Sequence, residues 1–302
     1  MSSFDLNKVP SKKDSIAIVT GANIGLGYET TIGLAKKQIK VIMACRNKEK
    51  AENARKEILQ KVPGADLGII LLDLGNLESV RNFASSFQEK YNRLDLLINN
   101  AGIMIPPFSK TTDGFESQIG VNYLGHFLLT GLLMPLLEKT ASSRIVTLSS
   151  IAHRNGVINF DDLNSEKSYS KMTAYGQSKV ACLMFAYEMQ RRLEAKGSKV
   201  ISVASHPGVS NTNLSQYAPA WFKVIGSLLL PFFMHAPEKA ALPSLYAALG
   251  EDVKGGDYFG PTGFREMKGA PGKVSSSTYS SDKDIAKRLW DVSQELTGIK
   301  YL

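Results

Sequence analysis

Cysteine and long apolar runs are both scarce in this chain, and each shortage excludes a class of protein. The 302 residues include only two cysteines, Cys45 and Cys182. Two are too few for a disulfide framework or a cysteine-rich zinc site, so we expect no metal centre and a reducing, cytoplasmic location. The chain has no stretch of about 18 apolar residues, so no membrane-spanning helix is expected. Residues 1–14 are polar and charged, without the apolar core of a signal peptide.

The chain also lacks any concentrated basic run, although basic residues are in excess. It has 36 Lys and Arg against 28 Asp and Glu, a net charge of +8. Such a surplus can indicate nucleic acid, a membrane surface or an anionic ligand as partner. Here the basic residues are scattered among acidic ones, with no aromatic stacking platform, so no nucleic-acid partner is expected.

What the chain does have is a regular alternation of short apolar runs with helical patterns. The predicted strands are 15–20, 40–44, 67–72, 94–99, 144–149, 199–204 and 257–259; the predicted helices are 25–37, 48–61, 77–91, 115–138, 174–195, 237–249 and 284–295. Continuously apolar strands are typical of parallel sheets that are buried on both faces. The pattern predicts an α/β fold of Rossmann type, a doubly wound parallel sheet of about seven strands with helices on both faces.

A glycine-rich loop follows the first predicted strand and leads into the first helix. Its glycines are Gly21, Gly25 and Gly27. Without a Cβ, the backbone can approach a pyrophosphate closely, and the helix N-terminus supplies free N–H donors. The alternative is a simple tight turn, but the strand before and the helix after favour a dinucleotide site.

The end of the second strand indicates which dinucleotide is bound. Proteins that bind NAD usually place a carboxylate there for the ribose 2′-hydroxyl, whereas this chain has Arg46. A guanidinium can bind a 2′-phosphate through two donors, so NADP(H) is the predicted cofactor. The alternative for Arg46 is a solvated surface charge. Asn23 is a weaker candidate for the same phosphate, and Asp73 would either accept from the adenine amino group or cap the following helix.

Tyr175 and Lys179 stand four residues apart at the start of a long apolar helix, which places them on one face. Lowering the pKa of a phenol from near 10 to about 7 takes roughly 4 kcal/mol of preferential phenolate stabilisation. A neighbouring ammonium can contribute to that stabilisation. Alone, however, the pair is commonplace and is better explained as an amphipathic helix with a lysine at its edge.

Several motifs in order along the chain resolve that ambiguity. They are the glycine loop from Thr20 to Gly27, Asn99-Asn100-Ala101-Gly102, Asn122 within VNYLGHF, Ser149-Ser150, the Tyr175/Lys179 pair, and Pro207-Gly208 with Thr212. With these motifs the chain resembles the short-chain dehydrogenase/reductase family over roughly residues 14–300, and most closely its retinol-dehydrogenase-like group. No linker-like composition shift and no internal repeat divides the chain, so we expect a single domain, 1–302, which binds the dinucleotide and carries its own catalytic site.

The resemblance implies a catalytic tetrad. Tyr175 would be the general acid in reduction and the general base in oxidation, while Lys179 would lower its pKa and bind the nicotinamide ribose. Ser150 would hydrogen-bond the substrate oxygen, and Asn122 would hold a water that links Lys179 to solvent. Taken alone, Ser150 is better explained as a strand-end cap, and Asn122 as a helix interruption that bonds the backbone. The predicted cofactor contacts are Gly21, Asn23, Ile24, Gly25, Gly27, Arg46, Asp73, Leu74, Asn99, Ala101, Gly102, Tyr175, Lys179, Pro207, Gly208 and Thr212.

The predicted function is an NADP(H)-dependent oxidoreductase acting on a carbonyl or alcohol group of a bulky apolar substrate. Residues 213–236 are interpreted as a substrate lid, with a partly buried connecting helix or a membrane-contacting segment as alternatives. Residues 269–302 are interpreted as a tail on the same domain. A non-catalytic NADPH-binding regulator is the alternative function. The family's use of its long helices for pairing makes a homodimer an option, and His153 and His206 are expected to be structural rather than catalytic.

Overall fold

The computed structural model describes residues 4–209 and 236–302, and within them it contains the expected parallel sheet. The sheet has eight strands in the order β3-β2-β1-β4-β5-β6-β7-β8. Their bounds are β1 Ile16–Thr20, β2 Lys40–Cys45, β3 Leu67–Leu71, β4 Leu96–Asn99, β5 Arg144–Leu148, β6 Ile201–Ser205, β7 Tyr258–Pro261 and β8 Pro271–Lys273. Neighbouring strands from β3 to β7 pair in parallel, which confirms the predicted Rossmann-type sheet.

The eighth strand is the one addition to the predicted sheet. β8 pairs antiparallel with β7 and lies inside the segment 269–302. Its sequence, Pro-Gly-Lys, contains no apolar run, so no hydrophobic pattern could reveal it. The segment interpreted as a tail therefore begins by extending the sheet edge.

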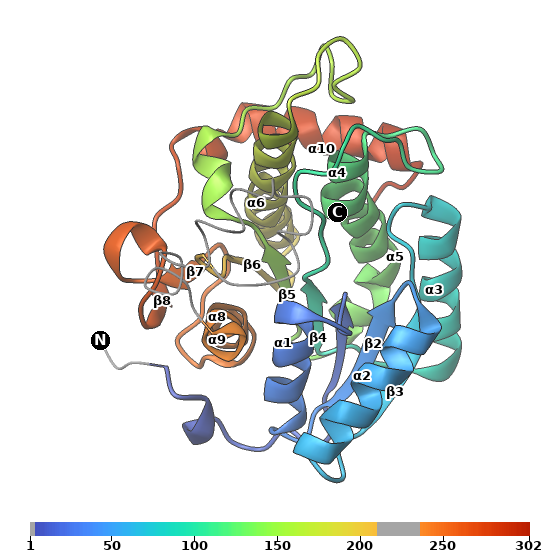
Figure 1. Cartoon of the computed structure of the whole chain (residues 1–302), viewed down its shortest axis with the longest axis vertical. Helices are drawn as coiled ribbons and strands as arrows, with labels where there is room; N and C mark the ends of the chain where they lie inside the picture. Colours follow the sequence, from blue (N-terminus) through green and yellow to red (C-terminus); the bar gives the residue numbers. More distant parts are fainter. Residues whose placement is uncertain (1–3, 210–235) are drawn as a thin grey trace.

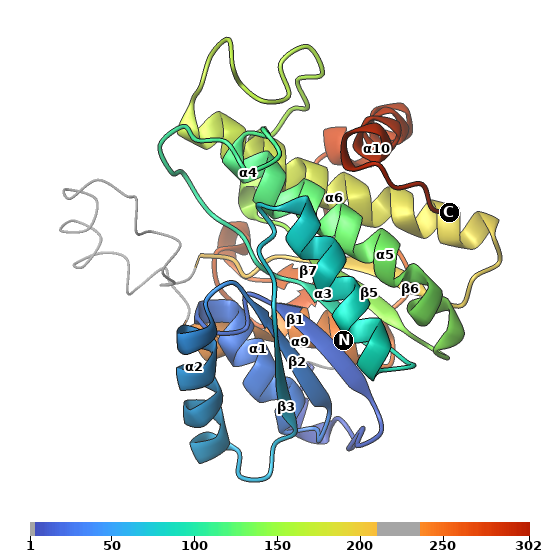
Figure 2. The same ribbon diagram turned by 90° about the vertical axis from the view of Figure 1, so that its right-hand side faces the viewer.

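Helices cover both faces of the sheet, as expected (Figures 1 and 2). Strand residues alternate between the two cores: Ile18 and Ile42 face one, whereas Val19 and Val41 face the other. The first core is completed by α3 (Leu77–Lys90), α5 (Gly125–Lys139) and α6 (Lys171–Ala195); the second is completed by α1 (Gly25–Ala35), α2 (Lys48–Lys61) and α9 (Leu242–Leu249), which follows the short α8 (Pro237–Ala240).

The C-terminal helix α10 (Lys283–Thr297) packs on the outer side of α6 (Figure 2). Trp290 is buried there, with its ring centroid 5.0 Å from that of Phe127. Beyond the helix, Tyr301 packs so closely that a Cβ on Gly131 would come within 2.6 Å of it. Arg81 on α3 donates to the carbonyl of Thr297 at 2.7 Å. The end of the chain is thus anchored to two helices of the first core.

The helix predicted over 115–138 is divided into three parts. The short α4 (Ser117–Ile119) leads through a π-helical turn, η2 (Gly120–Leu124), into α5. By length and composition Ser117–Lys139 could cross a membrane, although no membrane-spanning helix was expected. Most of that stretch is buried inside the protein, as in the core helix of an α/β fold.

Candidate active site

The glycine loop joins the end of β1 to the start of α1 at the carboxyl edge of the sheet. Gly21 and Gly25 have φ angles of 67° and 57°, in the left-handed region that favours glycine. A Cβ on Gly27 would lie 2.3 Å from the Gly21 carbonyl oxygen. In the described residues no side chain caps α1, and its first turn contains no acidic residue. Its N-terminal N–H groups and positive dipole end therefore fit an anionic pyrophosphate.

A second turn, at the end of β4, is bound directly to this loop. The Thr20 hydroxyl accepts hydrogen bonds from the backbone N–H groups of Asn100 and Ala101, both at 2.9 Å. The Asn100 amide in return donates to the Thr20 carbonyl at 2.7 Å. Asn100 thus braces the loop, although the sequence analysis did not choose it as a cofactor contact. Asn99, which it did choose, directs its amide to Thr130 on α5 at 3.0 Å.

Residues expected around the adenosine lie at the ends of β2 and β3. Arg46 directly follows β2 and is exposed, with no ion pair to any described residue. The Asp73 carboxylate accepts from the backbone N–H of Gly75 at 2.9 Å. The helix that follows is capped by Asn76 rather than by Asp73, so the capping alternative for Asp73 was wrong. Leu74 is buried next to it, and Asn23 and Ile24 lie in the glycine loop.

Lys179 is buried, and its ammonium lies close to Gly102 of the Asn-Asn-Ala-Gly turn. Its Nζ donates to the carbonyl of Leu148 at 3.1 Å and lies 5.9 Å from the ring centroid of Tyr175. A Cβ on Gly102 would approach that Nζ to 3.4 Å. An ammonium has three donors, so two remain for a ribose beside the glycine.

The two serines at the end of β5 have different environments. Ser149 is buried, and its hydroxyl donates to the carbonyl of Lys179 at 2.8 Å, which helps to fix α6. Ser150 is half-buried, and its Oγ accepts from the N–H of Ala152 at 3.2 Å. Since accepting a bond leaves the hydroxyl proton free, Ser150 can still donate to a substrate oxygen. This geometry favours Ser150 for the substrate-orienting role.

Asn122 lies in the π-helical turn, and both the oxygen and the nitrogen of its side-chain amide make hydrogen bonds to surrounding residues. The amide oxygen accepts from the N–H of Ile103 at 2.7 Å, and the amide nitrogen donates to the Ile103 carbonyl and to the hydroxyl of Ser178. Its backbone carbonyl accepts from the Nδ1 of His126 at 2.9 Å. Asn122 therefore joins the loop after β4 to α6, one residue from Lys179.

His126 is a part of this network that the sequence analysis missed, although it quoted the motif that contains the residue. Because its Nδ1 donates to the Asn122 carbonyl, a neutral ring accepts at Nε2, where the Thr20 hydroxyl lies at 2.9 Å. Burial, with a smaller contribution from the Lys179 charge, lowers the pKa of His126 to about 4 and keeps it neutral. One imidazole thus connects Asn122 with the glycine loop.

On the nicotinamide side, Pro207 and Gly208 follow β6, where Gly208 has a φ of 72°. Thr212 and residues 213–235 lie outside the described residues, so the lid stays a prediction. Among residues 4–209 and 236–302, no group of three His, Cys, Asp or Glu side chains could hold a metal ion.

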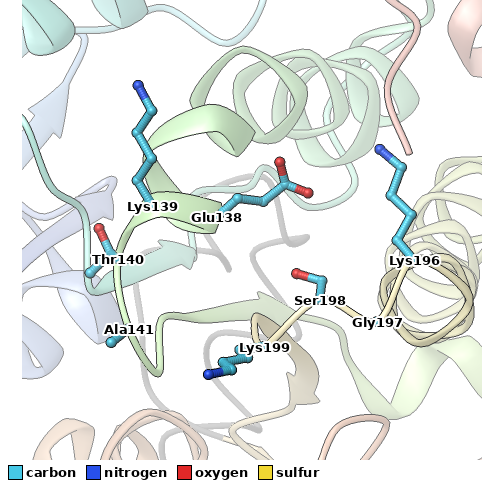
Figure 3. Close-up of a pocket in the computed structure, with 8 residues that line it drawn as sticks. All are labelled: Glu138, Lys139, Thr140, Ala141, Lys196, Gly197, Ser198 and Lys199. Atoms are coloured by element: carbon cyan, nitrogen blue, oxygen red, sulfur yellow. The ribbon is translucent and has the colours of Figure 1, made fainter.

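A hollow of about 500 Å³ is lined by residues outside this site (Figure 3). Its lining, residues 138–141 and 196–199, directly precedes β5 and β6, so the hollow opens at their amino ends. Lys139 lies in the last turn of α5 and Lys196 is the C-cap of α6, positions where cations stabilise a helix dipole. Ligands of doubly wound sheets bind at the opposite, carboxyl edge, where the candidate active site lies.

Known proteins are similar to this chain in both sequence and fold. A family model described as short chain dehydrogenase matches residues 15–222. Human retinol dehydrogenase 13 is 43% identical over 290 residues, which are 94% of this chain and 84% of that protein. Human retinol dehydrogenase 14 is 42% identical over 299 residues, 93% of this chain and 86% of that protein.

Among solved structures, an uncharacterized protein from Mycobacterium paratuberculosis aligns over 100% of both chains, with a TM-score of 0.83 and 38% identity. RhlG of Pseudomonas aeruginosa, solved as an NADP complex, covers 82% of this chain and 94% of its own, with a TM-score of 0.65 and 23% identity, and shows the fold alone. The chain belongs to the short-chain dehydrogenase/reductase family and, within it, is similar to the retinol dehydrogenases.

Proposed function

We propose that this oxidoreductase uses NADP(H) and interconverts an alcohol and a carbonyl on a bulky apolar substrate. The observation that carries the proposal is the position of Lys179, whose ammonium lies near both the Tyr175 ring and Gly102 at the carboxyl edge of the sheet. The same edge holds the uncapped start of α1 and the glycine loop. A dinucleotide on that loop would therefore extend toward the proposed tetrad.

Each residue of the tetrad has a distinct proposed role. NADP(H), when bound, supplies or accepts the hydride. In the reductive direction, Tyr175 gives its phenolic proton to the carbonyl oxygen, and Lys179 favours the resulting phenolate by its positive charge. Ser150 donates to the same oxygen and orients it. Asn122 fixes the loop and helix around Lys179, and a water held near it would pass a proton from solvent.

The choice of NADP(H) over NAD(H) is supported by Arg46. It is exposed at the end of β2, has no ion pair within the described residues, and no carboxylate takes its place. The bulky apolar substrate is supported by the similarity to proteins named retinol dehydrogenases. A homodimer through α5 and α6 stays a prediction, as does the cytoplasmic location; α10 already covers part of α6.

The direct test follows NADPH absorbance with a panel of long-chain and cyclic aldehydes and ketones, with NADH in parallel reactions. We expect turnover with NADPH that favours the bulkier apolar substrates. Tight NADPH binding without turnover of any substrate would instead support the regulator, which the intact tetrad disfavours. A preference for NADH would refute the choice of cofactor.

A further inference from the structure

A strained turn between β7 and β8, residues 265–267, lies against the predicted nicotinamide side of the site. Arg265 and Glu266 have φ angles of 49° and 57°, and in the described residues they are the only consecutive pair of non-glycine residues with positive φ. Left-handed backbone is unfavourable for residues that carry a Cβ and persists where the surroundings impose it. Such strain directs attention to what holds this turn in place.

The Glu266 carboxylate contacts two elements at once. Its Oε1 accepts from the Arg154 guanidinium at 2.6 Å, and its Oε2 lies 3.0 Å from Nε2 of His206. Arg154 lies on η3 (Ile151–Asn155), the turn that follows Ser150. His206 directly precedes Pro207 and Gly208. One side chain thus joins the serine side of the site to the Pro-Gly side.

The ring of His206 is held with its Nε2 next to the Glu266 carboxylate. Its Nδ1 accepts from the backbone N–H of Gly208 at 3.2 Å, so the proton of a neutral ring is on Nε2, the atom that lies 3.0 Å from Glu266 in a close polar contact without hydrogen-bond geometry. The ring is fully buried against Gly260, where a Cβ would come within 2.0 Å of Nε2. Burial alone would raise the pKa of Glu266, but contacts with His206 and Arg154 hold that pKa below its ordinary value.

The backbone of the strained turn also contacts the Pro-Gly turn directly. The N–H of Val209 donates to the carbonyl of Met267 at 2.9 Å. A Cβ on Gly208 would lie 2.5 Å from that same carbonyl oxygen, so the two turns are packed without space for a side chain. Any displacement of residues 265–267 would therefore displace Gly208 and Val209.

A second histidine, His153, connects Ser150 to residues 275–277, which follow β8. His153 donates from Nδ1 to the Ser150 carbonyl at 2.7 Å and accepts at Nε2 from the N–H of Ser277 at 3.2 Å. Arg154 also donates to the carbonyl of Ser275 at 2.9 Å. Residues 265–277 thus contact both sides of the proposed reaction site.

We propose that Glu266 is a positioning residue that holds the Pro207-Gly208 turn at a fixed place relative to Ser150. This rests on the proposed function, in which Ser150 orients the substrate and the turn contacts the nicotinamide. Through Arg154 and His206, the carboxylate sets the geometry between the two groups without touching either reactant. Catalysis depends strongly on such geometry, because small misplacements of reacting groups lower rates steeply.

The test compares Glu266→Gln with Glu251→Gln, which makes the same change at an exposed site outside this cluster. In the cofactor-free protein, amide hydrogen exchange of the segment containing Gly208 and Val209 should be at least about tenfold faster in Glu266→Gln and unchanged in the control. In the loaded enzyme, kcat should fall about tenfold or more, while KM for NADPH changes by less than about threefold.

Glu266→Gly provides a second variant in case the first folds poorly, because it removes the carboxylate and also relieves the left-handed strain. It should show the same exchange and kcat changes. Wild-type exchange in both variants would overturn the proposal, and so would a loss of kcat without faster exchange. Absence of turnover by the wild-type protein would refute the proposed function, while the exchange measurement would still decide the positioning role.

Discussion

At the scale of single residues, the side chains of the proposed site are held by hydrogen bonds and still keep donors that a ligand can use. The Lys179 ammonium donates one of its protons to the Leu148 carbonyl, and the Ser150 hydroxyl oxygen accepts from the N–H of Ala152. Both therefore keep hydrogen-bond donors for a ligand. This division explains why buried polar groups can be held rigidly and still take part in chemistry.

Tyr175→Phe should abolish turnover and leave NADPH affinity within about threefold, because the ring keeps its packing while the transferable proton is lost. Steady-state rates and fluorescence titration with NADPH provide the two measurements. Tyr91→Phe, which removes a hydroxyl from a tyrosine at the end of α3, should leave both unchanged. Retained turnover in Tyr175→Phe would show that another group supplies the proton.

Arg46→Asp should shift the ratio of kcat/KM for NADPH over NADH toward NADH by more than about tenfold, or about 1.4 kcal/mol. The new carboxylate would repel the 2′-phosphate and could accept from the 2′-hydroxyl. Arg55→Asp, the same charge change within α2, serves as the control for general electrostatics. An unchanged cofactor ratio in Arg46→Asp would refute the role of this guanidinium.

Sequence reasoning identified residue types more reliably than side-chain directions. It chose Asn99 from its motif, yet in the structure the neighbouring Asn100 braces the glycine loop. It overlooked His126, whose role depends on Thr20, 106 residues earlier. A direction set by a partner so distant in sequence has no local signal in the chain.

At the scale of elements, the first turn of α1 packs closely against the glycine loop because Gly27 has no Cβ. Gly27→Ala should weaken NADPH binding by more than about tenfold and lower the melting temperature, because overpacking typically costs about 1–3 kcal/mol. The new methyl would meet the Gly21 carbonyl at 2.3 Å.

Titration with NADPH and thermal unfolding would check this expectation. Gly68→Ala is a matched control in β3, where the added methyl meets side-chain ends rather than backbone, Cδ1 of Ile42 at 2.8 Å and the hydroxyl of Tyr91 at 3.7 Å. Gly27→Ala with wild-type NADPH affinity would mean that the phosphates bind elsewhere.

The central strands and most helices were predictable because each buries a continuous or periodic apolar pattern. β8 and the π-helical turn at Asn122 were not. β8 depends on backbone pairing with β7, and the π-helical turn depends on contacts from the loop after β4 and from α6. Neither contribution appears in local hydrophobicity.

At the scale of the whole molecule, two buried histidines make stability depend on pH. Burial lowers the pKa of both His126 and His153 from 6.5 to about 4. The unfolded chain therefore binds protons more readily between these values, so the free energy of unfolding is highest above pH 6.5 and falls toward pH 4.

Urea unfolding midpoints measured between pH 7.5 and 5, a window of about 2.5 units that includes the unfolded histidine pKa, should decrease as the pH falls. His126→Gln should be less stable at pH 7.5 and should show a shallower decrease, because one of the two groups no longer titrates. Midpoints that stay constant across the window would contradict the neutral, buried state of both rings.

The anchoring of the chain's end on α5 has a consequence for synthesis. The Tyr301 hydroxyl donates to the Phe127 carbonyl, a contact across 174 positions. Phe127 and Gly131 therefore acquire their contact with Tyr301 only after the residues beyond α10 have been synthesised, so this part of the first core is completed last.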